Sequence, residues 1–124
     1  MSGFNYWQSE KDGNWYWHLK AGNNKIILAN KLGHICSDIN GCVGDIVFVR
    51  NWTMLDEEVR ERYILRLEGK SGQFYAQIRS RDVGIDVVGS TETYTRPHNR
   101  EKGLRSIVKN ARLGIVRRID DPNA

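Results

Sequence analysis

The order of apolar and polar residues predicts a chain of short strands with two helices between them. Apolar and polar side chains alternate through 15–20, so Trp15, Trp17 and Leu19 are expected on one face of a strand. The Asp12-Gly13 pair before this strand predicts a tight hairpin, and Ser71-Gly72 holds the matching place in the second half of the chain. The predicted strands are 4–8, 15–20, 26–29, 74–79 and 85–88, with longer alternating runs at 59–68 and 113–119.

The stretch that begins near Thr95 predicts an amphipathic helix. Thr95 is a suitable N-cap, Pro97 falls in the first turn where its missing N–H costs little, and Asn110 suits the C-terminal end. The apolar residues of this stretch gather on one side of a helical wheel, at Leu104, Ile107, Val108 and Ala111.

A weaker pattern predicts an earlier helix, with Ser37 as its cap. Apolar residues recur at helical spacing at Ile39, Cys42 or Val43, Ile46 and Val49. Two glycines and several β-branched residues oppose a helix here, and 46–49 alone would also suit a buried strand. Similarity to the later helix favours the helical interpretation.

The two halves of the chain repeat each other at a constant offset of 59 residues. Gly103 to Asn110 falls on Gly44 to Asn51 without a gap, and further matched pairs are Lys11 with Lys70, Gly13 with Gly72, Tyr16 with Tyr75 and Ile26 with Ile85. We therefore expect one domain made of two repeats, 4–61 and 62–119, that share a core, followed by a polar tail at 120–124. On this interpretation the run 59–68 closes the first repeat and opens the second.

Two segments resemble the YegP-like proteins, small bacterial proteins of unknown function built from tandem domains. They are Leu-Lys-Ala-Gly-Asn-Asn-Lys-Ile-Ile at 19–27 and the stretch from Tyr94-Thr95 to Gly-Leu-Arg-Ser-Ile-Val-Lys-Asn at 103–110. The resemblance covers nearly the whole chain and implies an α+β fold: two tandem β3-α-β repeats sharing one antiparallel sheet, with exchanged closing strands and the helices on one face. The chain departs from the family at 35–43, which lacks the polar helix start, and in extra residues near Met54. The family supplies no catalytic residue that can be placed on this chain.

Charge is unevenly distributed along the sequence. The formal net charge is +4, with 6 Lys and Arg against 8 Asp and Glu in residues 1–61, and 13 against 7 in residues 62–124. The basic second half permits an anionic partner.

Several classes of protein are not supported by the sequence. No run of about 18 apolar residues is present, and the first residues lack the basic and apolar regions of a signal peptide. We therefore expect a cytoplasmic protein that does not enter a membrane, and a monomer, because the repeats complete each other. Cys36 and Cys42 are expected to be reduced thiols. With His34 they lack the fourth ligand of a structural zinc site, so no metal or cofactor is expected.

The first candidate site is a cationic stripe on the later helix, formed by His98, Lys102, Arg105, Lys109 and Arg112. These residues fall within an arc of about 80° opposite the apolar side of the helix, at 100° per residue. Such a stripe could neutralise several phosphates of a nucleic acid. Alternatively, it is an ordinary solvated helix face whose cations favour the C-terminal end of the helix dipole.

The second candidate site is the strand face that points away from the helices. It carries Tyr16, His18 and Lys20 in the first repeat and Tyr75, Gln77 and Arg79 in the second. Rings interleaved with cations suit single-stranded nucleic acid, because bases stack on rings while cations follow the phosphates. The alternative is a plain wet face of an antiparallel sheet.

The remaining candidates point away from catalysis. Trp7, Trp15, Trp17 and Trp52 would indicate a partner interface if they were exposed, although Trp15 and Trp17 suit a core. No phosphate-binding glycine loop, nucleophile elbow or zinc-protease motif is present, although the scattered His and Cys residues could still meet in space. We therefore expect a non-enzymatic, small basic binding module that engages nucleic acid. The alternative is a protein–protein interaction module.

Overall fold

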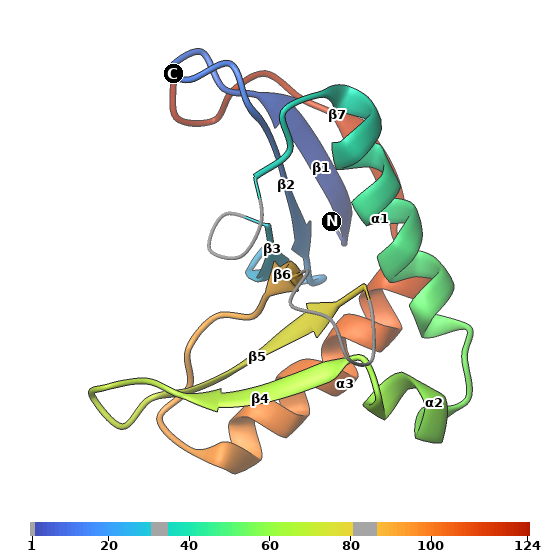
Figure 1. Cartoon of the computed structure of the whole chain (residues 1–124), viewed down its shortest axis with the longest axis vertical. Helices are drawn as coiled ribbons and strands as arrows, with labels where there is room; N and C mark the ends of the chain where they lie inside the picture. The colour runs from blue at the N-terminus through green and yellow to red at the C-terminus, as the bar shows by residue number, and fades with distance from the viewer. Residues whose placement is uncertain (1, 31–34, 81–86) are drawn as a thin grey trace.

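Seven strands form one mixed sheet in the order β4-β5-β6-β3-β2-β1-β7 in the computed structural model, which describes residues 2–30, 35–80 and 87–124 (Figure 1). The elements are β1 (Gly3–Gln8), β2 (Trp15–Lys20), β3 (Ile26–Ala29), α1 (Ile39–Thr53), α2 (Glu57–Glu61), β4 (Ile64–Glu68), β5 (Phe74–Arg79), β6 (Val87–Ser90), α3 (Pro97–Leu113) and β7 (Ile115–Arg118). The α+β class predicted from the sequence is confirmed.

The hairpins form where the glycine turns predict them. β1 pairs antiparallel with β2, and β4 pairs antiparallel with β5. Gly13 and Gly72 lie in the two turns with φ angles of 74° and 73°, a left-handed conformation that a residue with a Cβ adopts only at a cost. The observed strands β2, β3 and β5 have the predicted bounds.

Both predicted helices are present, although their ends differ from the prediction. The N-cap of α1 is Asp38 rather than Ser37, and its carboxylate accepts a hydrogen bond of 2.7 Å from the Gly41 N–H. Helix α3 begins at Pro97, after Arg96 rather than Thr95, and continues past Asn110 to Leu113. Apolar and polar residues are poorly separated on the two sides of α1, so its own sequence pattern favours a helix only weakly. Tertiary packing stabilises the helix by burying Cys42, Ile46, Val49 and Trp52.

The prediction of a wholly antiparallel sheet is wrong at one edge. β7 runs parallel to β1, with Gly3 opposite Ile115 and Asn5 opposite Arg117. Glycines permit this pairing, because a Cβ on Gly3 would lie 2.6 Å from the Ile115 carbonyl oxygen, and one on Gly114 would lie 2.8 Å from the Gly3 Cα. The chain therefore closes on its own first strand.

The long alternating run at 59–68 is not one strand. Val59 to Glu61 belong to the short helix α2, and only Ile64–Glu68 forms a strand, which pairs with β5. Helix α2 starts with Glu57 and Glu58 next to Asp56, and acidic residues favour the positive end of a helix dipole. The predicted closing strand of the first half therefore does not form, whereas the closing strand of the second half does.

Some predictions fall outside the described residues. The first two residues of the strand predicted at 85–88 lie there. The described part of that strand, β6, continues to Ser90, beyond the predicted end at Val88.

The hydrophobic core lies between the sheet and the two long helices. Helix α1 packs on β1 and β2, helix α3 packs on β1, β2, β3 and β5, and the helices contact each other. Figure 1 shows both helices along the right and lower side of the bent sheet. The core residues are Phe4, Trp15, Trp17, Leu19, Ile27, Leu28, Cys36, Cys42, Ile46, Val49, Trp52, Ala76, Ile78, Val88, Leu104, Ile107 and Ala111.

All four tryptophans are buried rather than exposed as a partner interface. Trp15, Trp17 and Trp52 belong to the core, whereas Trp7 packs on Tyr16 and His18 on the other face of the sheet. Trp17 is fully buried and lies beside Phe4, with 5.8 Å between ring centroids. Its ring also reaches Gly89, where a Cβ would approach to 2.9 Å. Gly89 in β6 therefore leaves room for the Trp17 ring at the junction of β3 and β6.

Candidate functional site

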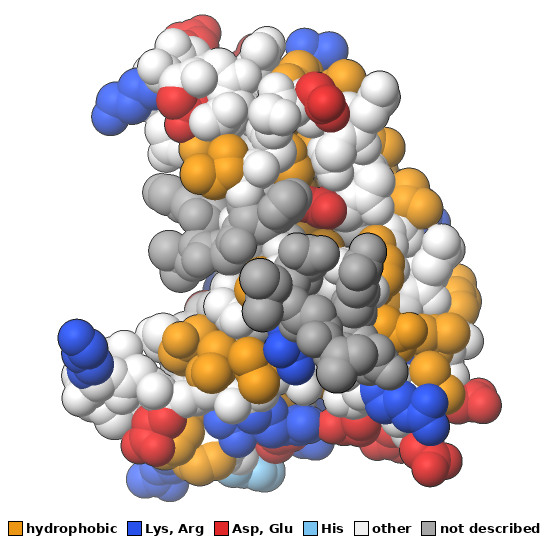
Figure 2. All heavy atoms as spheres, viewed as in Figure 1, with side chains coloured by type: hydrophobic (Ala, Val, Ile, Leu, Met, Phe, Trp, Pro, Cys, Tyr) orange, Lys and Arg blue, Asp and Glu red, His pale blue; other side chains and the backbone are white. Residues whose placement is uncertain are grey.

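Helix α3 brings the five predicted stripe residues onto one exposed face. His98, Lys102, Arg105, Lys109 and Arg112 are all solvent-exposed. No ion pair joins any of them to a carboxylate in the described part of the chain. In Figure 2, Lys and Arg side chains gather in the lower part of the view, where Figure 1 places α3 and β4.

The stripe is left without acidic partners because the nearby carboxylates bind other arginines. Arg66 on β4 contacts Glu61 and Glu101, each at 2.7 Å, and Arg100 contacts Glu101 at 3.0 Å. The hydrogen bonds from Arg66 hold the pKa values of both glutamates below their usual range, and the pair of glutamates raises the pKa of Arg66. Glu101, an acidic residue in α3, is therefore directed away from the stripe.

Two stripe residues also have roles within the fold. Arg112 donates a hydrogen bond to the carbonyl oxygen of Thr53, the last residue of α1. Arg105 borders a small cavity of about 110 Å³ together with Glu57 and Glu61. The negative charge there weakens the positive potential at Arg105, so Lys102 and Lys109 form the less compensated part of the stripe.

The predicted aromatic and basic sheet face is only partly accessible. Tyr16 donates a hydrogen bond of 2.6 Å to Asp12 and stacks on Trp7 at 6.3 Å between centroids. His18 is 6% exposed and lies 4.9 Å from the Trp7 ring. The expectation of a wet face is therefore wrong at His18, because Trp7 of the neighbouring strand packs on the same side.

His18 is held as a neutral ring. Burial, with a smaller contribution from the charge of Lys20, lowers the pKa of His18 to about 4. The Asn5 side-chain nitrogen lies 3.1 Å from His18 Nε2. An amide nitrogen only donates, so Nε2 accepts and the ring proton is on Nδ1. At neutral pH this histidine supplies no positive charge for binding.

The second group of predicted face residues lies apart from the first. Tyr75, Gln77 and Arg79 lie on β5, and two strands, β6 and β3, separate β5 from β2. All three are half-buried, and Gln77 donates a hydrogen bond of 3.2 Å to Ser90. Figure 1 shows β2 and β5 running in very different directions, so the two groups do not form one continuous platform.

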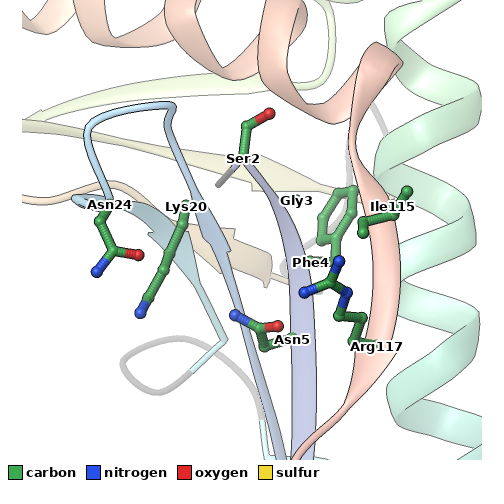
Figure 3. Close-up of a pocket in the computed structure, with 8 residues that line it drawn as sticks. All are labelled: Ser2, Gly3, Phe4, Asn5, Lys20, Asn24, Ile115 and Arg117. Atoms are coloured by element: carbon green, nitrogen blue, oxygen red, sulfur yellow. The ribbon is translucent and has the colours of Figure 1, made fainter.

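Residues that the sequence prediction missed complete a small pocket around Lys20. The pocket has a volume of about 130 Å³, and its polar lining includes Asn5, Lys20, Asn24 and Arg117 (Figure 3). Alternation along β1 could have placed Asn5 on the face of His18. Arg117 could not have been found in this way, because its position depends on the unpredicted parallel pairing of β7 with β1.

The cysteines are buried free thiols. Cys36 donates a hydrogen bond of 3.2 Å to Asp45, and its hydrogen bond with Cys42, burial and the nearby Asp45 carboxylate raise its thiol pKa. His34 lies outside the described residues. Among the residues that the structure describes, no group of three or more His, Cys, Asp or Glu side chains could hold a metal ion.

None of the described helices is both long and apolar enough to cross a membrane. The geometry thus defines a small α+β protein that presents a cationic helix face and a separate polar pocket.

Comparisons with known proteins agree on the fold. No protein-family model matches the sequence. A UPF0339 protein of Acinetobacter baylyi is 26% identical over 117 residues, which cover 94% of this chain and 96% of the relative. The solution NMR structure of yegP from E. coli, a protein of unknown function, has a TM-score of 0.80 at 22% identity, covering 98% of this chain and 96% of that one. The UPF0339 protein SO3888 from Shewanella oneidensis has a TM-score of 0.79 at 17% identity, covering 96% and 92%.

The resemblance to the YegP-like proteins that the sequence motifs indicated is therefore confirmed, in sequence at 26% identity and in fold. The similar proteins are of unknown function, so the resemblance supplies a fold and no activity.

Proposed function

We propose that the protein is a non-enzymatic binding module that engages the phosphate backbone of nucleic acid through the cationic stripe of α3. The observation that supports this most directly is the absence of acidic partners along the stripe among the described residues, while Arg66, Arg100 and Lys25 elsewhere are ion-paired. Cations held without a partner are available to replace the counterions of a phosphate chain.

The length of the stripe suits several phosphates. From His98 to Arg112 the helix rises about 21 Å, at 1.5 Å per residue. One strand of a duplex carries a phosphate about every 3.4 Å along the axis, so about six phosphates lie alongside. Contacts of this kind position a protein on nucleic acid without reading its sequence.

Salt dependence tests the proposal. Four phosphate contacts predict that raising salt from 50 to 200 mM weakens binding about 150-fold on duplex DNA and about 50-fold on single strands. Fluorescence anisotropy with labelled duplex DNA and random single-stranded RNA measures both slopes. The double variant Arg105→Ala/Lys109→Ala should bind more weakly, and its salt slope on duplex DNA should be shallower by about 2.

The matched control is Lys11→Ala/Lys70→Ala, which removes the same charge from the two exposed hairpin tips. Binding by this control should fall much less than binding by the stripe variant. An equal loss in both variants would mean that net charge, and not the stripe, attracts nucleic acid. An absence of binding at low salt would also refute the proposal.

A protein–protein interaction module is the second candidate, and the edge strand β7 favours it. β7 pairs only with β1 in the described sheet, and Leu113, Ile115 and Val116 beside this edge are 74%, 45% and 37% exposed. An open edge with apolar side chains suits strand addition by a partner. Binding of this kind should tolerate salt and should be lost in Ile115→Lys, whereas Arg105→Ala/Lys109→Ala should leave it intact.

We also infer that the chain consists of tandem repeats with exchanged ends. Adding 59 to the residue numbers of β2 gives the bounds of β5. The same offset relates Gly13 to Gly72, and the φ angles of these two glycines are nearly equal. The Trp17 and Ala76 amides, also 59 apart, both donate to side-chain oxygens, of Asn30 and Thr91 respectively. Equivalent turns predict equal losses, of about 1 kcal/mol each, for Gly13→Ala and Gly72→Ala in urea unfolding. Clearly unequal losses would count against equivalent turns.

A further inference from the structure

A groove lies between the turn that joins β2 to β3 and the beginning of α3. Helix α3 packs on both strands, and the groove is bordered by their connecting turn, by residues 92–95 and by the helix as far as Ser106. Its volume of about 490 Å³ falls in the range of ligand-binding clefts. We propose that this groove accepts an unpaired base of a single-stranded nucleic acid whose phosphates lie on the cationic stripe. The inference rests on the proposed function and narrows the ligand from nucleic acid in general to unpaired strands.

Charge places the groove beside the stripe without making it a second cationic patch. The charged residues in its described lining are Lys25, Glu92 and Lys102. Lys25 and Glu92 form an ion pair at 3.2 Å, so their charges largely cancel. Lys102 belongs to both the groove and the stripe, and no carboxylate pairs with it in the described part of the chain. A phosphate held at Lys102 therefore has its own sugar and base next to the groove.

The other polar groups of the groove are uncharged amides and hydroxyls. They belong to Asn23, Thr93, Thr95, Asn99 and Ser106. Asn23 Oδ1 accepts a hydrogen bond of 3.1 Å from the Lys25 backbone N–H, which leaves its amide hydrogens as donors. Ser106 Oγ accepts one of 3.1 Å from the Asn110 side chain, which leaves its hydroxyl hydrogen as a donor. Neutral donors and acceptors suit the edge of a base, whereas a second phosphate would require cations.

An aromatic side chain forms part of the wall of the groove. The Tyr94 hydroxyl lies near the Glu92 carboxylate and against Gly103, where a Cβ would approach its oxygen to 2.1 Å. All three residues border the groove, so the phenol lies at its wall. Burial and the Glu92 carboxylate raise the pKa of Tyr94, so the ring carries no negative charge that would repel a nucleotide at neutral pH. Proteins that bind single strands stack bases on such rings.

Pairing determines whether a base can enter the groove. In a duplex each base is stacked and its Watson–Crick edge is occupied by its partner, whereas an unpaired base can be splayed out onto a side chain. The stripe alone would contact the phosphates of either form. Binding of a single strand should therefore include a contribution from its bases that varies little with salt, beside the salt-dependent contribution of its phosphates.

Three fluorescent probes of equal length separate base contacts from phosphate contacts. They are a mixed-sequence DNA single strand, an abasic strand with the same number of phosphates, and a duplex. Anisotropy with the full chain at several salt concentrations gives the affinity and the salt slope for each probe. The single strand should bind at least about fivefold more tightly than the abasic strand, because only the single strand has a base to place in the groove.

Variants that keep every charge test the groove itself. Thr93→Ala/Asn99→Ala removes a hydroxyl and an amide, and should weaken single-strand binding at least about fivefold without changing the salt slope. Binding of the abasic strand and the duplex should not change. Ser106→Leu narrows the groove and should have the same effects. The matched control is Asn51→Ala/Ser71→Ala, which removes an amide and a hydroxyl from exposed positions outside the groove and should bind like the native chain. A 15N NMR spectrum of each variant verifies its fold.

The outcomes distinguish failure of this inference from failure of the proposed function. If Arg105→Ala/Lys109→Ala weakens all three probes but the native chain binds the single and abasic strands equally, the stripe is supported and the groove is refuted. Unchanged single-strand binding in both groove variants would also refute the groove. If the groove variants weaken single-strand binding while the stripe variant weakens no probe, the groove is supported and the stripe is refuted. An absence of binding to every probe at low salt would refute both.

Discussion

Glycines at equivalent positions of the two helices have different surroundings. A Cβ on Gly103 in α3 would lie 2.1 Å from the Tyr94 hydroxyl oxygen and 2.7 Å from the adjoining ring carbon. A Cβ on Gly44 in α1, 59 residues earlier, would meet nothing within 4 Å. The glycine shared by both halves is thus required for packing in one helix only.

This contrast predicts opposite effects of one substitution. Gly44→Ala should stabilise the protein by about 0.5–1 kcal/mol, because alanine is the better helix former. Gly103→Ala should destabilise it by about 1–3 kcal/mol, because the Tyr94 ring has to leave its place against α3. Urea unfolding of both variants measures the difference. A gain in stability at both positions would contradict the packing assigned to Tyr94.

His18 predicts loss of stability in mild acid. Its folded pKa of about 4 lies below the ordinary value of 6.5, so the unfolded chain binds the proton more readily. The contribution of the neutral ring is complete above pH 6.5 and is lost as the pH falls toward 4. The loss should reach about 2 kcal/mol once solvent screening is allowed for. Urea unfolding from pH 7.5 to 4 measures it.

The matched variant is His18→Gln, which keeps a side-chain acceptor for Asn5 but does not titrate. Its stability should vary less over the same pH range than that of the native chain. If the two proteins show the same pH profile, other groups cause the acid loss and His18 is not buried as a neutral ring.

At the scale of elements, the two long helices differ in how they begin. Asp38 caps α1 through the Gly41 N–H, whereas the N-cap residue of α3, Arg96, makes no side-chain cap bond. Asp38→Ala should therefore cost about 1 kcal/mol, and Arg96→Ser should gain about 0.5–1 kcal/mol by supplying an acceptor. Thermal unfolding measures both changes. A loss of stability in Arg96→Ser would show that Arg96 has a role beyond its position as cap.

Local patterns predicted the elements whose own residues determine them. The alternation in 15–20 and the glycine turns gave the bounds of β2, β3 and β5, because side-chain alternation and φ preference act within a few residues. The prediction of one continuous strand at 59–68 was wrong, because alternation alone does not exclude a helical turn. The acidic residues 57 and 58 start helix α2 there. The resemblance implied that the closing strand at 113–119 would exchange between the halves, but nothing near β1 in sequence specifies that β7 pairs with β1 in parallel.

The features of the candidate site were also predicted only where a single element determines them. Helical periodicity was sufficient to place the five stripe residues of α3 on one face, since that face depends on a single element. Burial of His18 depends on Trp7 from the adjacent strand, and the pocket around Lys20 depends on Arg117 from the far end of the chain. Features made by two or three elements were therefore missed or misjudged.

At the scale of the whole molecule, the two halves are joined through shared parts. β7 from the second half pairs with β1, and α3 packs on three strands of the first half, β1, β2 and β3. Among the described residues, the β3–β6 junction has, in contrast, one registered pair, Ala29 with Ser90. The core that α3 completes therefore couples the halves more than the central strand pairing does.

This coupling predicts that a destabilising substitution in the second half also lowers the stability of the first half. Ile107 in α3 is fully buried, and Ile107→Ala should cost about 2–5 kcal/mol. All four tryptophans lie in residues 1–61, so their fluorescence reports on the first half only. The urea midpoint by tryptophan fluorescence should fall in Ile107→Ala by the same amount as the midpoint by far-UV circular dichroism. Val47→Ala, on the exposed side of α1, is the control and should leave both midpoints nearly unchanged. A fluorescence midpoint that does not respond to Ile107→Ala would mean that the halves unfold independently, each with a core of its own.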